Sequence, residues 1–159
     1  LRGFTQRMAR EVEAATGHRC PILLAPDSVA VEADADERLL RPILVNLLTN
    51  AVKYSEPNQV VHVHVHAVAD GVEWVIRDAG IGIPAGDLEW VFQPFHRGRN
   101  VGDRAGSGLG LVIVKRCVEL HGGAVRLTSR VNDGTTVTVR LPRAAQPGTS
   151  PAANPAPSA

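Results

Sequence analysis

The chain has 159 residues, of which 44% are hydrophobic and 21% charged, and this is the length and composition of one globular domain. Its formal net charge is +1, so the overall charge gives no reason to expect nucleic acid or an anionic membrane surface as a partner. No apolar run approaches the roughly 18 to 20 residues that a membrane-spanning helix needs. The chain opens with Leu1 rather than Met and lacks a secretory signal, so we expect an excised piece of a cytoplasmic protein.

The first quarter of the chain predicts a helix followed by short strands. Apolar residues recur every three or four positions over residues 4–15, which indicates an amphipathic helix, and Gly17 ends it. The apolar run 22–24 predicts a strand, and Val29 and Val31 alternate with smaller residues in the same way. Cys20 lies far from the second cysteine, Cys117, and no C-x-x-C motif is present, so we expect two reduced, buried thiols.

The remaining predicted elements are a helix with a clear apolar stripe, two hairpins and a further helix that is flanked by glycines. Asp36 is a suitable N-cap for a helix that ends near Ser55, and a wide apolar stripe runs along it. Alternation of apolar and polar residues predicts one hairpin from the runs 60–68 and 72–77. A second hairpin is predicted from the runs 124–129 and 135–141, and a helix over 108–120 precedes it.

The stretch 79–107 is rich in glycine and reads mostly as loop, with a short helical piece at 88–92. After Pro142 the composition turns to Pro, Ala and Ser without apolar periodicity, so we expect residues 143–159 to be a disordered tail. The folded domain is therefore expected to end at residue 142.

Helices separated by hairpins, rather than strict β-α alternation, predict an α+β fold of two layers, with a mixed, mostly antiparallel sheet and three helices on one face. The other face would then meet water, which suits the strand that carries His62, His64 and His66 on one side. Three imidazoles in a row do not converge on one point, so a metal site there is the less favoured reading.

Three polar residues, Asn46, Asn50 and Lys53, share one side of the helix that has the clear apolar stripe. Taken alone they are as consistent with a solvated face as with a binding site. Two glycine-rich segments favour the binding site. The segment 78–84 places a carboxylate at a strand end before two glycines, and the segment 106–111 leads into a helix, whose N-terminal N–H groups attract phosphate.

Other phosphate-binding families fit badly, because the chain has no Gly-Lys pair of a P-loop, no glycine fingerprint directly after a strand and no H-R-D or D-F-G motif. Four segments in order, 46–55, 78–84, 92–97 and 106–111, instead resemble the N, G1, F and G2 boxes of sensor histidine kinases. With the flanking residues 119–123, the likeness covers residues 1–142. It implies the Bergerat ATP-binding fold of the GHKL ATPase and kinase superfamily, with ATP and Mg²⁺ as cofactors.

The resemblance assigns roles to the nucleotide-facing residues. Asp78 would accept a hydrogen bond from the adenine amino group, and Tyr54 would lie near the ribose. Asn50 would hold Mg²⁺ through oxygen, with Asn46 acting less directly, in part through water. Lys53 would neutralise phosphate charge.

The same resemblance makes residues 98–105 a mobile lid whose start is anchored by Phe92 and Phe95, with Arg97 facing the γ-phosphate. Arg99 and Arg104 are better explained as a solvated loop than as catalytic residues. The implied catalytic residues are Asn50, Lys53 and Arg97. The implied ATP-binding residues are Asn46, Asn50, Lys53, Tyr54, Asp78, Gly80, Gly82, Ile83, Phe95, Gly106, Ser107, Gly108, Leu109, Gly110 and Leu111.

One departure separates this chain from hydrolytic relatives such as gyrase, which place a Glu four residues before the Mg²⁺-binding Asn. Here that position is Asn46, and an amide cannot act as a general base. The pattern therefore favours transfer of phosphate to another protein group over hydrolysis. The alternatives are a hydrolytic ATPase clamp, an ATP-sensing module without transfer and, less favoured, a stand-alone anti-sigma-factor kinase.

Histidine kinases carry their phosphoacceptor histidine in an H-box on a separate dimerisation domain. None of the six histidines here stands in such a motif, so the resemblance places that domain before Leu1. The expected partners are this domain and, through it, a response regulator, with no nucleic acid. The chain itself is expected to be monomeric, to bind Mg-ATP and not to phosphorylate itself. The sequence leaves open whether the parent protein is anchored in a membrane.

Overall fold

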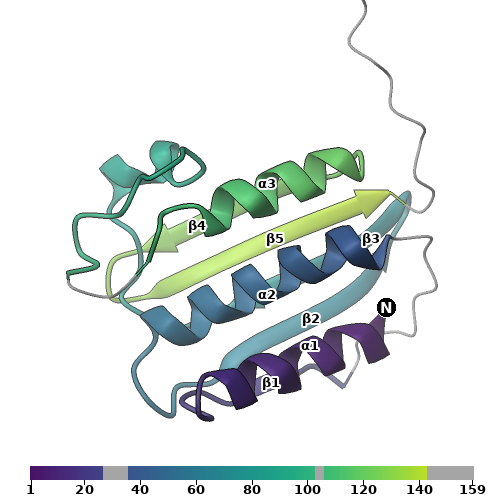
Figure 1. The fold of residues 1–159 in the computed structure, drawn as a ribbon, viewed down its shortest axis with the longest axis horizontal. Helices are drawn as coiled ribbons and strands as arrows, with labels where there is room; N and C mark the ends of the chain where they lie inside the picture. The colour runs from purple at the N-terminus through teal and green to yellow at the C-terminus, as the bar shows by residue number, and fades with distance from the viewer. Residues whose placement is uncertain (27–35, 103–105, 143–159) are drawn as a thin grey trace, which may run out of the picture.

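A computed structural model describes residues 1–26, 36–102 and 106–142, which form a layer of helices packed on one five-stranded sheet (Figure 1). The predicted two-layer α+β fold is confirmed. The helices are α1 (Arg2–Ala15), α2 (Glu37–Tyr54), α3 (Gly110–Leu120) and the 3₁₀ helix η1 (Ala85–Trp90). The strands are β1 (Ile22–Leu24), β2 (Val61–Val68), β3 (Gly71–Arg77), β4 (Ala124–Arg130) and β5 (Gly134–Pro142).

The sheet has the strand order β1-β2-β3-β5-β4. β1 is parallel to β2, and every other neighbouring pair is antiparallel. Both predicted hairpins, β2–β3 and β4–β5, are present. The first strand of each hairpin is its outer strand, so the second strands, β3 and β5, pair with each other. They are antiparallel, so the end of β3 lies beside the start of β5.

The core lies between the sheet and α1, α2 and α3, which all cover the same face (Figure 1). Period-two alternation supplies the sheet side, where Val63, Val65 and Trp74 are fully buried. The apolar stripe of α2 supplies the helix side, with Leu40 and Ile43 among its fully buried residues. The opposite sheet face has no helix over it in the described part of the chain, as the alternation predicts.

Local contacts fix the positions of the first two helices. The carboxylate of Asp36 accepts a hydrogen bond from the Arg38 N–H at 2.9 Å and so caps α2, as predicted. The contact with Arg38 also holds the pKa of Asp36 below its usual range. α1 is attached to the sheet through its buried Thr5, whose hydroxyl accepts a hydrogen bond from Trp74 Nε1 at 3.0 Å.

Two predicted boundaries are wrong. Helix α3 begins at Gly110 and not at 108, because Gly108 has φ +71°, outside the helical region. The helical piece expected at 88–92 is the 3₁₀ helix Ala85–Trp90, which starts directly after Pro84. The strand expected at Val29 and Val31 and the tail expected at 143–159 lie outside the described residues.

Candidate functional site

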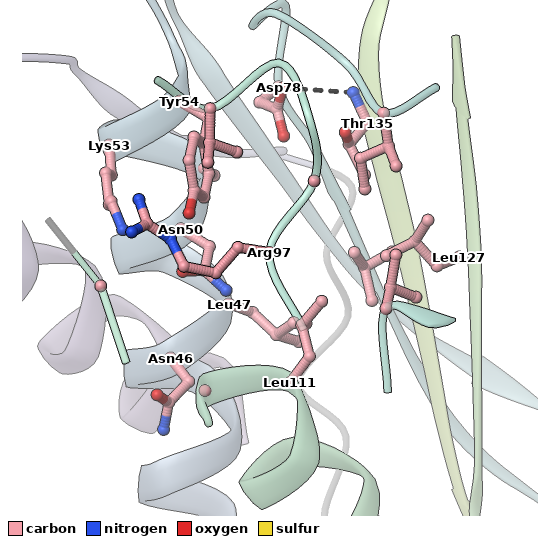
Figure 2. A pocket seen from close by; sticks show the side chains of 18 of the residues that line it. Asn46, Leu47, Asn50, Lys53, Tyr54, Asp78, Arg97, Leu111, Leu127 and Thr135 are labelled. Atoms are coloured by element: carbon pink, nitrogen blue, oxygen red, sulfur yellow. Dashed lines mark hydrogen bonds between the residues drawn. The ribbon is translucent and has the colours of Figure 1, made fainter. Parts of the chain in front are cut away.

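A cavity of about 360 Å³ opens between α2, the N-terminal end of α3 and the buried face of the sheet (Figure 2). Its walls come from all four segments that the sequence singled out. Most of the residues expected to bind a nucleotide line it, namely Asn46, Asn50, Lys53, Tyr54, Asp78, Gly82, Ile83, Arg97, Gly106, Ser107, Gly108, Gly110 and Leu111. Gly80, Phe95 and Leu109 do not.

One end of the cavity is defined by Asp78, which directly follows β3 and is only 8% exposed. Its Oδ1 accepts hydrogen bonds from the N–H groups of Gly80 at 2.9 Å and Thr135 at 3.1 Å (Figure 2). Both contacts fall on one oxygen, so among the described residues Oδ2 is the oxygen left for a ligand. Burial raises the pKa of Asp78, and the two N–H groups oppose that shift in part.

The glycine loop that follows Asp78 is held by backbone contacts. Gly82 has φ +65°, and a side chain there would collide with the Arg130 carbonyl group. The Ile83 N–H donates to Ser129 Oγ at 2.9 Å. Gly80 lies against the Tyr54 carbonyl group, so its close approach is to the protein's own backbone. Gly80 does not line the cavity, and the lack of a side chain there lets the loop pack on the end of α2.

The long side of the cavity is formed by α2, which presents Asn46, Asn50 and Lys53 along one face toward the open space (Figure 2). The Asn46 Nδ2 donates to the Pro42 carbonyl at 2.8 Å, so its oxygen is turned the other way. The Lys53 ammonium lies 4.6 Å from the centre of the Tyr54 ring. Two amides and an ammonium therefore border the cavity. These three residues do not form a plain solvent-exposed helix face.

The end opposite Asp78 is formed by the segment 106–111 and the start of α3. Ser107 Oγ accepts a hydrogen bond from the Leu109 N–H at 3.3 Å, and Leu109 itself caps the helix without lining the cavity. A side chain at Gly110 would come within 3.0 Å of Asn46 Oδ1, so glycine allows α3 to start close against α2. The N–H groups of a helix start make this end suited to an anion.

The segment that carries Arg97 closes the remaining side. Arg97 extends into the cavity toward Asn50 and Lys53 of α2 (Figure 2). The expected anchoring by Phe95 is wrong, because its side chain is 75% exposed. The backbone at residue 95 is left-handed, with φ +61°, and its N–H donates to the Gly108 carbonyl at 3.2 Å, a geometry that turns the ring outward. Phe92 is half-buried, within 6.0 Å of the Lys115 ammonium. Residues 103–105 of the expected lid lie outside the described residues.

Sequence reasoning missed several residues of the walls. Thr135 follows a hairpin turn and reads as an ordinary strand residue, although the Gly-Thr pair at the start of β5 was a usable signal. His96 and Asn100 each place a buried polar atom, Nε2 and Oδ1, that has no partner among the described residues. Apolar walls come from Leu47 and Leu127, which the patterns marked only as core.

Other polar and reactive groups of the described residues lie outside this cavity. His66 Nε2 contacts Glu73 Oε1 at 3.0 Å on the open sheet face. Within the ranges that the structure describes, no cluster of three or more His, Cys, Asp or Glu residues is arranged to hold a metal ion. Both cysteines are free and buried, and burial raises the pKa of each thiol. None of the helices described is both long and apolar enough to cross a bilayer.

Comparison with known proteins decides the family. Residues 35–145 match the model of the "Histidine kinase-, DNA gyrase B-, and HSP90-like ATPase" family. The chain belongs to this family. Within this family, the chain is similar to histidine kinases. It is 42% identical over 113 residues to the histidine protein kinase DivJ of Caulobacter vibrioides, and the aligned region covers 70% of this chain and 19% of DivJ.

Two solved structures share the fold. The mycobacterial sensor histidine kinase MprB superposes with a TM-score of 0.76 at 31% identity, covering 91% of this chain and 96% of that one. Full-length ShkA in complex with AMPPNP superposes with a TM-score of 0.77 at 29% identity, covering 91% of this chain and 30% of that one. The match to nearly all of the MprB chain shows that this is a histidine kinase ATPase domain. The chain spans about a fifth of the length of DivJ.

Proposed function

We propose that this domain binds Mg-ATP in the cavity and presents the γ-phosphate to a histidine on a separate dimerisation domain of a two-component sensor kinase. The observation that carries the proposal is the order of groups along one cavity. A buried carboxylate lies at one end, a helix start lies at the other, and the amides and ammonium of α2 lie between them, with Arg97 extending toward Asn50 and Lys53. This order matches a purine base, a metal-bound triphosphate and its terminal phosphate.

Adenine is assigned to the Asp78 end. A carboxylate accepts hydrogen bonds and donates none when ionised, so its free Oδ2 suits the adenine amino group. Oδ1 is held by two N–H groups, which orients the carboxylate before any ligand arrives. Gly82, Ile83 and Tyr54 would border the base and ribose. The similarity to ShkA, whose structure holds AMPPNP, also supports a nucleotide here.

The phosphates are assigned to the opposite end. Lys53 and Arg97 supply positive charge, and the segment 106–111 supplies N–H groups at the start of α3. The unpartnered polar atoms of His96 and Asn100 in the cavity wall are consistent with a site that a polar ligand completes. Ser107, Gly106, Gly108 and Gly110 would contact the phosphates, whereas Leu109 would act only through the turn it caps.

Magnesium fits the donor set of α2. Mg²⁺ takes oxygen ligands and usually keeps several waters, and it would neutralise phosphate charge when bound. The side-chain amide of Asn50 lines the cavity, and its oxygen would hold the ion. Asn46 has its nitrogen engaged by the Pro42 carbonyl, so its oxygen is the atom left for contact through water. The donor set is thus amide oxygens beside phosphate-binding groups.

Transfer is favoured over hydrolysis, because the position that would hold a general base carries Asn46. Catalysis then rests on positioning and on charge stabilisation by Asn50, Lys53 and Arg97. None of the six histidines stands in a phosphoacceptor motif, so the acceptor is proposed on a separate dimerisation domain, which would in turn serve a response regulator. The folded unit is proposed to be residues 1–142, monomeric by itself, and to work in the cytoplasm, where ATP is supplied.

The test uses ATP labelled at the γ-phosphate. The chain alone is expected to gain no label, and an added two-helix acceptor domain from a sensor kinase that includes its own phosphoacceptor histidine is expected to gain it. Steady-state release of phosphate without an acceptor would favour a hydrolytic clamp. Saturable ATP binding without transfer to any acceptor would favour an ATP-sensing module. Label on the chain itself would contradict the separate acceptor.

A further inference from the structure

The acidic side chain of Asp87 lies outside every segment assigned to the nucleotide and is nevertheless 2% exposed. It belongs to η1 and lies beneath the chain that follows Arg97. Its Oδ2 accepts a hydrogen bond from the Arg99 N–H at 2.9 Å, and its Oδ1 is 3.4 Å from Arg99 Nε. A buried carboxylate is costly unless it is paired. Asp87 therefore holds its place through contacts with residue 99.

The two contacts with Arg99 differ in kind. The guanidinium belongs to a side chain that is 84% exposed, so water and salt weaken its pairing with Asp87. The backbone N–H contact is part-buried and charge-assisted. The main chain at residue 99, rather than the arginine side chain, is therefore what Asp87 holds.

A neighbouring contact also holds this segment. The side-chain amide of Asn100 donates to the Gly82 carbonyl at 2.9 Å. Upstream of Arg97, the Phe95 N–H donates to the Gly108 carbonyl at 3.2 Å. Arg97 thus lies between an attachment at residue 95 and two attachments at residues 99 and 100, and it extends toward α2 from that fixed stretch (Figure 2).

We propose that Asp87 is a positioning residue, which fixes the backbone of residue 99 so that Arg97 reaches the terminal phosphate of the nucleotide. The inference rests on the proposed function, because it assigns Arg97 to that phosphate. Asp87 contacts neither Asp78 nor the groups that hold it. Its loss is therefore expected to act on ATP and on transfer, and not on recognition of the base.

The first test compares ATP with ADP in calorimetric titrations of Asp87→Ala. Affinity for ADP is expected to stay within about twofold of wild type, whereas ATP loses its advantage over ADP and transfer to an added acceptor slows about tenfold or more. Glu89→Gln is the matched control, since it removes an exposed carboxylate from the same 3₁₀ helix and is expected to change neither nucleotide's affinity.

Two further variants separate the backbone contact from the ion pair. Asp87→Asn keeps an oxygen that accepts from the Arg99 N–H, and is expected to recover most of the ATP preference. Arg99→Ala keeps the N–H and removes the guanidinium, and is expected to resemble wild type. A loss in Arg99→Ala as large as in Asp87→Ala would contradict the assignment to the backbone contact.

A double-mutant cycle tests the route through Arg97. In an Arg97→Ala background, Asp87→Ala is expected to cause no further loss of ATP affinity or transfer. Additive losses in the cycle would overturn the inference. Equal losses of affinity for ATP and ADP would also overturn it, and so would a variant that no longer folds. The proposed function would still be upheld if the wild-type chain bound ATP. Wild-type protein that binds neither nucleotide would overturn the proposed function and this inference with it.

Discussion

The end of the cavity at Asp78 and the wall that carries Arg97 are built in different ways. The Asp78 end is formed where β3 and β5 meet, and its carboxylate is oriented by N–H groups from both sides. The wall that carries Arg97 is formed by connecting segments, which are held at a few points by Phe95, Arg99 and Asn100. Sheet ends are rigid, and loops are the part of a fold that moves. If the nucleotide binds as proposed, recognition of the base is therefore set before binding, whereas the phosphate contacts depend on how the loops are held.

The largest expected effect is at the rigid end. Asp78→Asn replaces the proposed acceptor of the adenine amino group, and a hydrogen bond to a charged group contributes about 1.5 to 3 kcal/mol. ATP binding is therefore expected to weaken about ten- to hundredfold, as measured by calorimetry. The fold is expected to survive, because an amide oxygen still accepts from Gly80 and Thr135. Asp133→Asn, an exposed residue in the β4–β5 turn, is the control and should bind ATP normally.

A smaller effect is expected midway along the cavity. Asn50→Ala removes the proposed oxygen ligand of Mg²⁺, so the tightening of ATP binding by Mg²⁺ should disappear while binding without metal stays near wild type. Asn46→Ala should keep most of the magnesium effect, because Asn46 is proposed to act only through water. Normal tightening of ATP binding by Mg²⁺ in Asn50→Ala would show that the assignment is wrong.

Lowering the pH tests the role of Asp78 in a graded way. Burial raises the folded-state pKa of Asp78, so the free domain takes up a proton there at a higher pH than an exposed aspartate does. ATP affinity should therefore fall as pH drops through that raised pKa, and Asp78→Asn should lack this part of the fall. The stability contributed by the group has the opposite sense: it is present below the unfolded pKa and is lost as pH rises through the folded one. Urea unfolding of both proteins across this pH range would measure it.

The smallest effect is expected at Phe95. Its ring is 75% exposed, so Phe95→Ala should change the free energy of unfolding by no more than about 0.5 kcal/mol. Phe4→Ala, at an 8% exposed position of α1, should cost about 3 to 5 kcal/mol. Similar losses in the two variants, measured by chemical denaturation, would mean that Phe95 packs in the core after all.

Much of the fold was predictable, because it rests on patterns that extend over whole elements. The stripe of α2 and the alternation of β2 each gave the correct face, and Asp36 gave the correct helix start. Gly108 was assigned to a helix because spacing carries no information about φ. The outward ring of Phe95 has the same cause, since a left-handed backbone at a non-glycine residue leaves no mark in hydrophobic periodicity.

The candidate site was predictable where a residue type matched a motif, and not where tertiary contacts decide. Asp78, Asn50 and Lys53 line the cavity as expected. Thr135 and Asp87 were missed because their partners lie 57 and 12 residues away along the chain, respectively. The local sequence does not indicate that a single aspartate is buried or that it accepts a hydrogen bond from an N–H group further along the chain.

The most direct test of the central claim is calorimetric titration of ATP into the wild-type chain, with and without Mg²⁺. We expect saturable binding at one site, made tighter by Mg²⁺. Absence of heat and of saturation, in protein shown by circular dichroism to be folded, would contradict the claim that this cavity holds Mg-ATP.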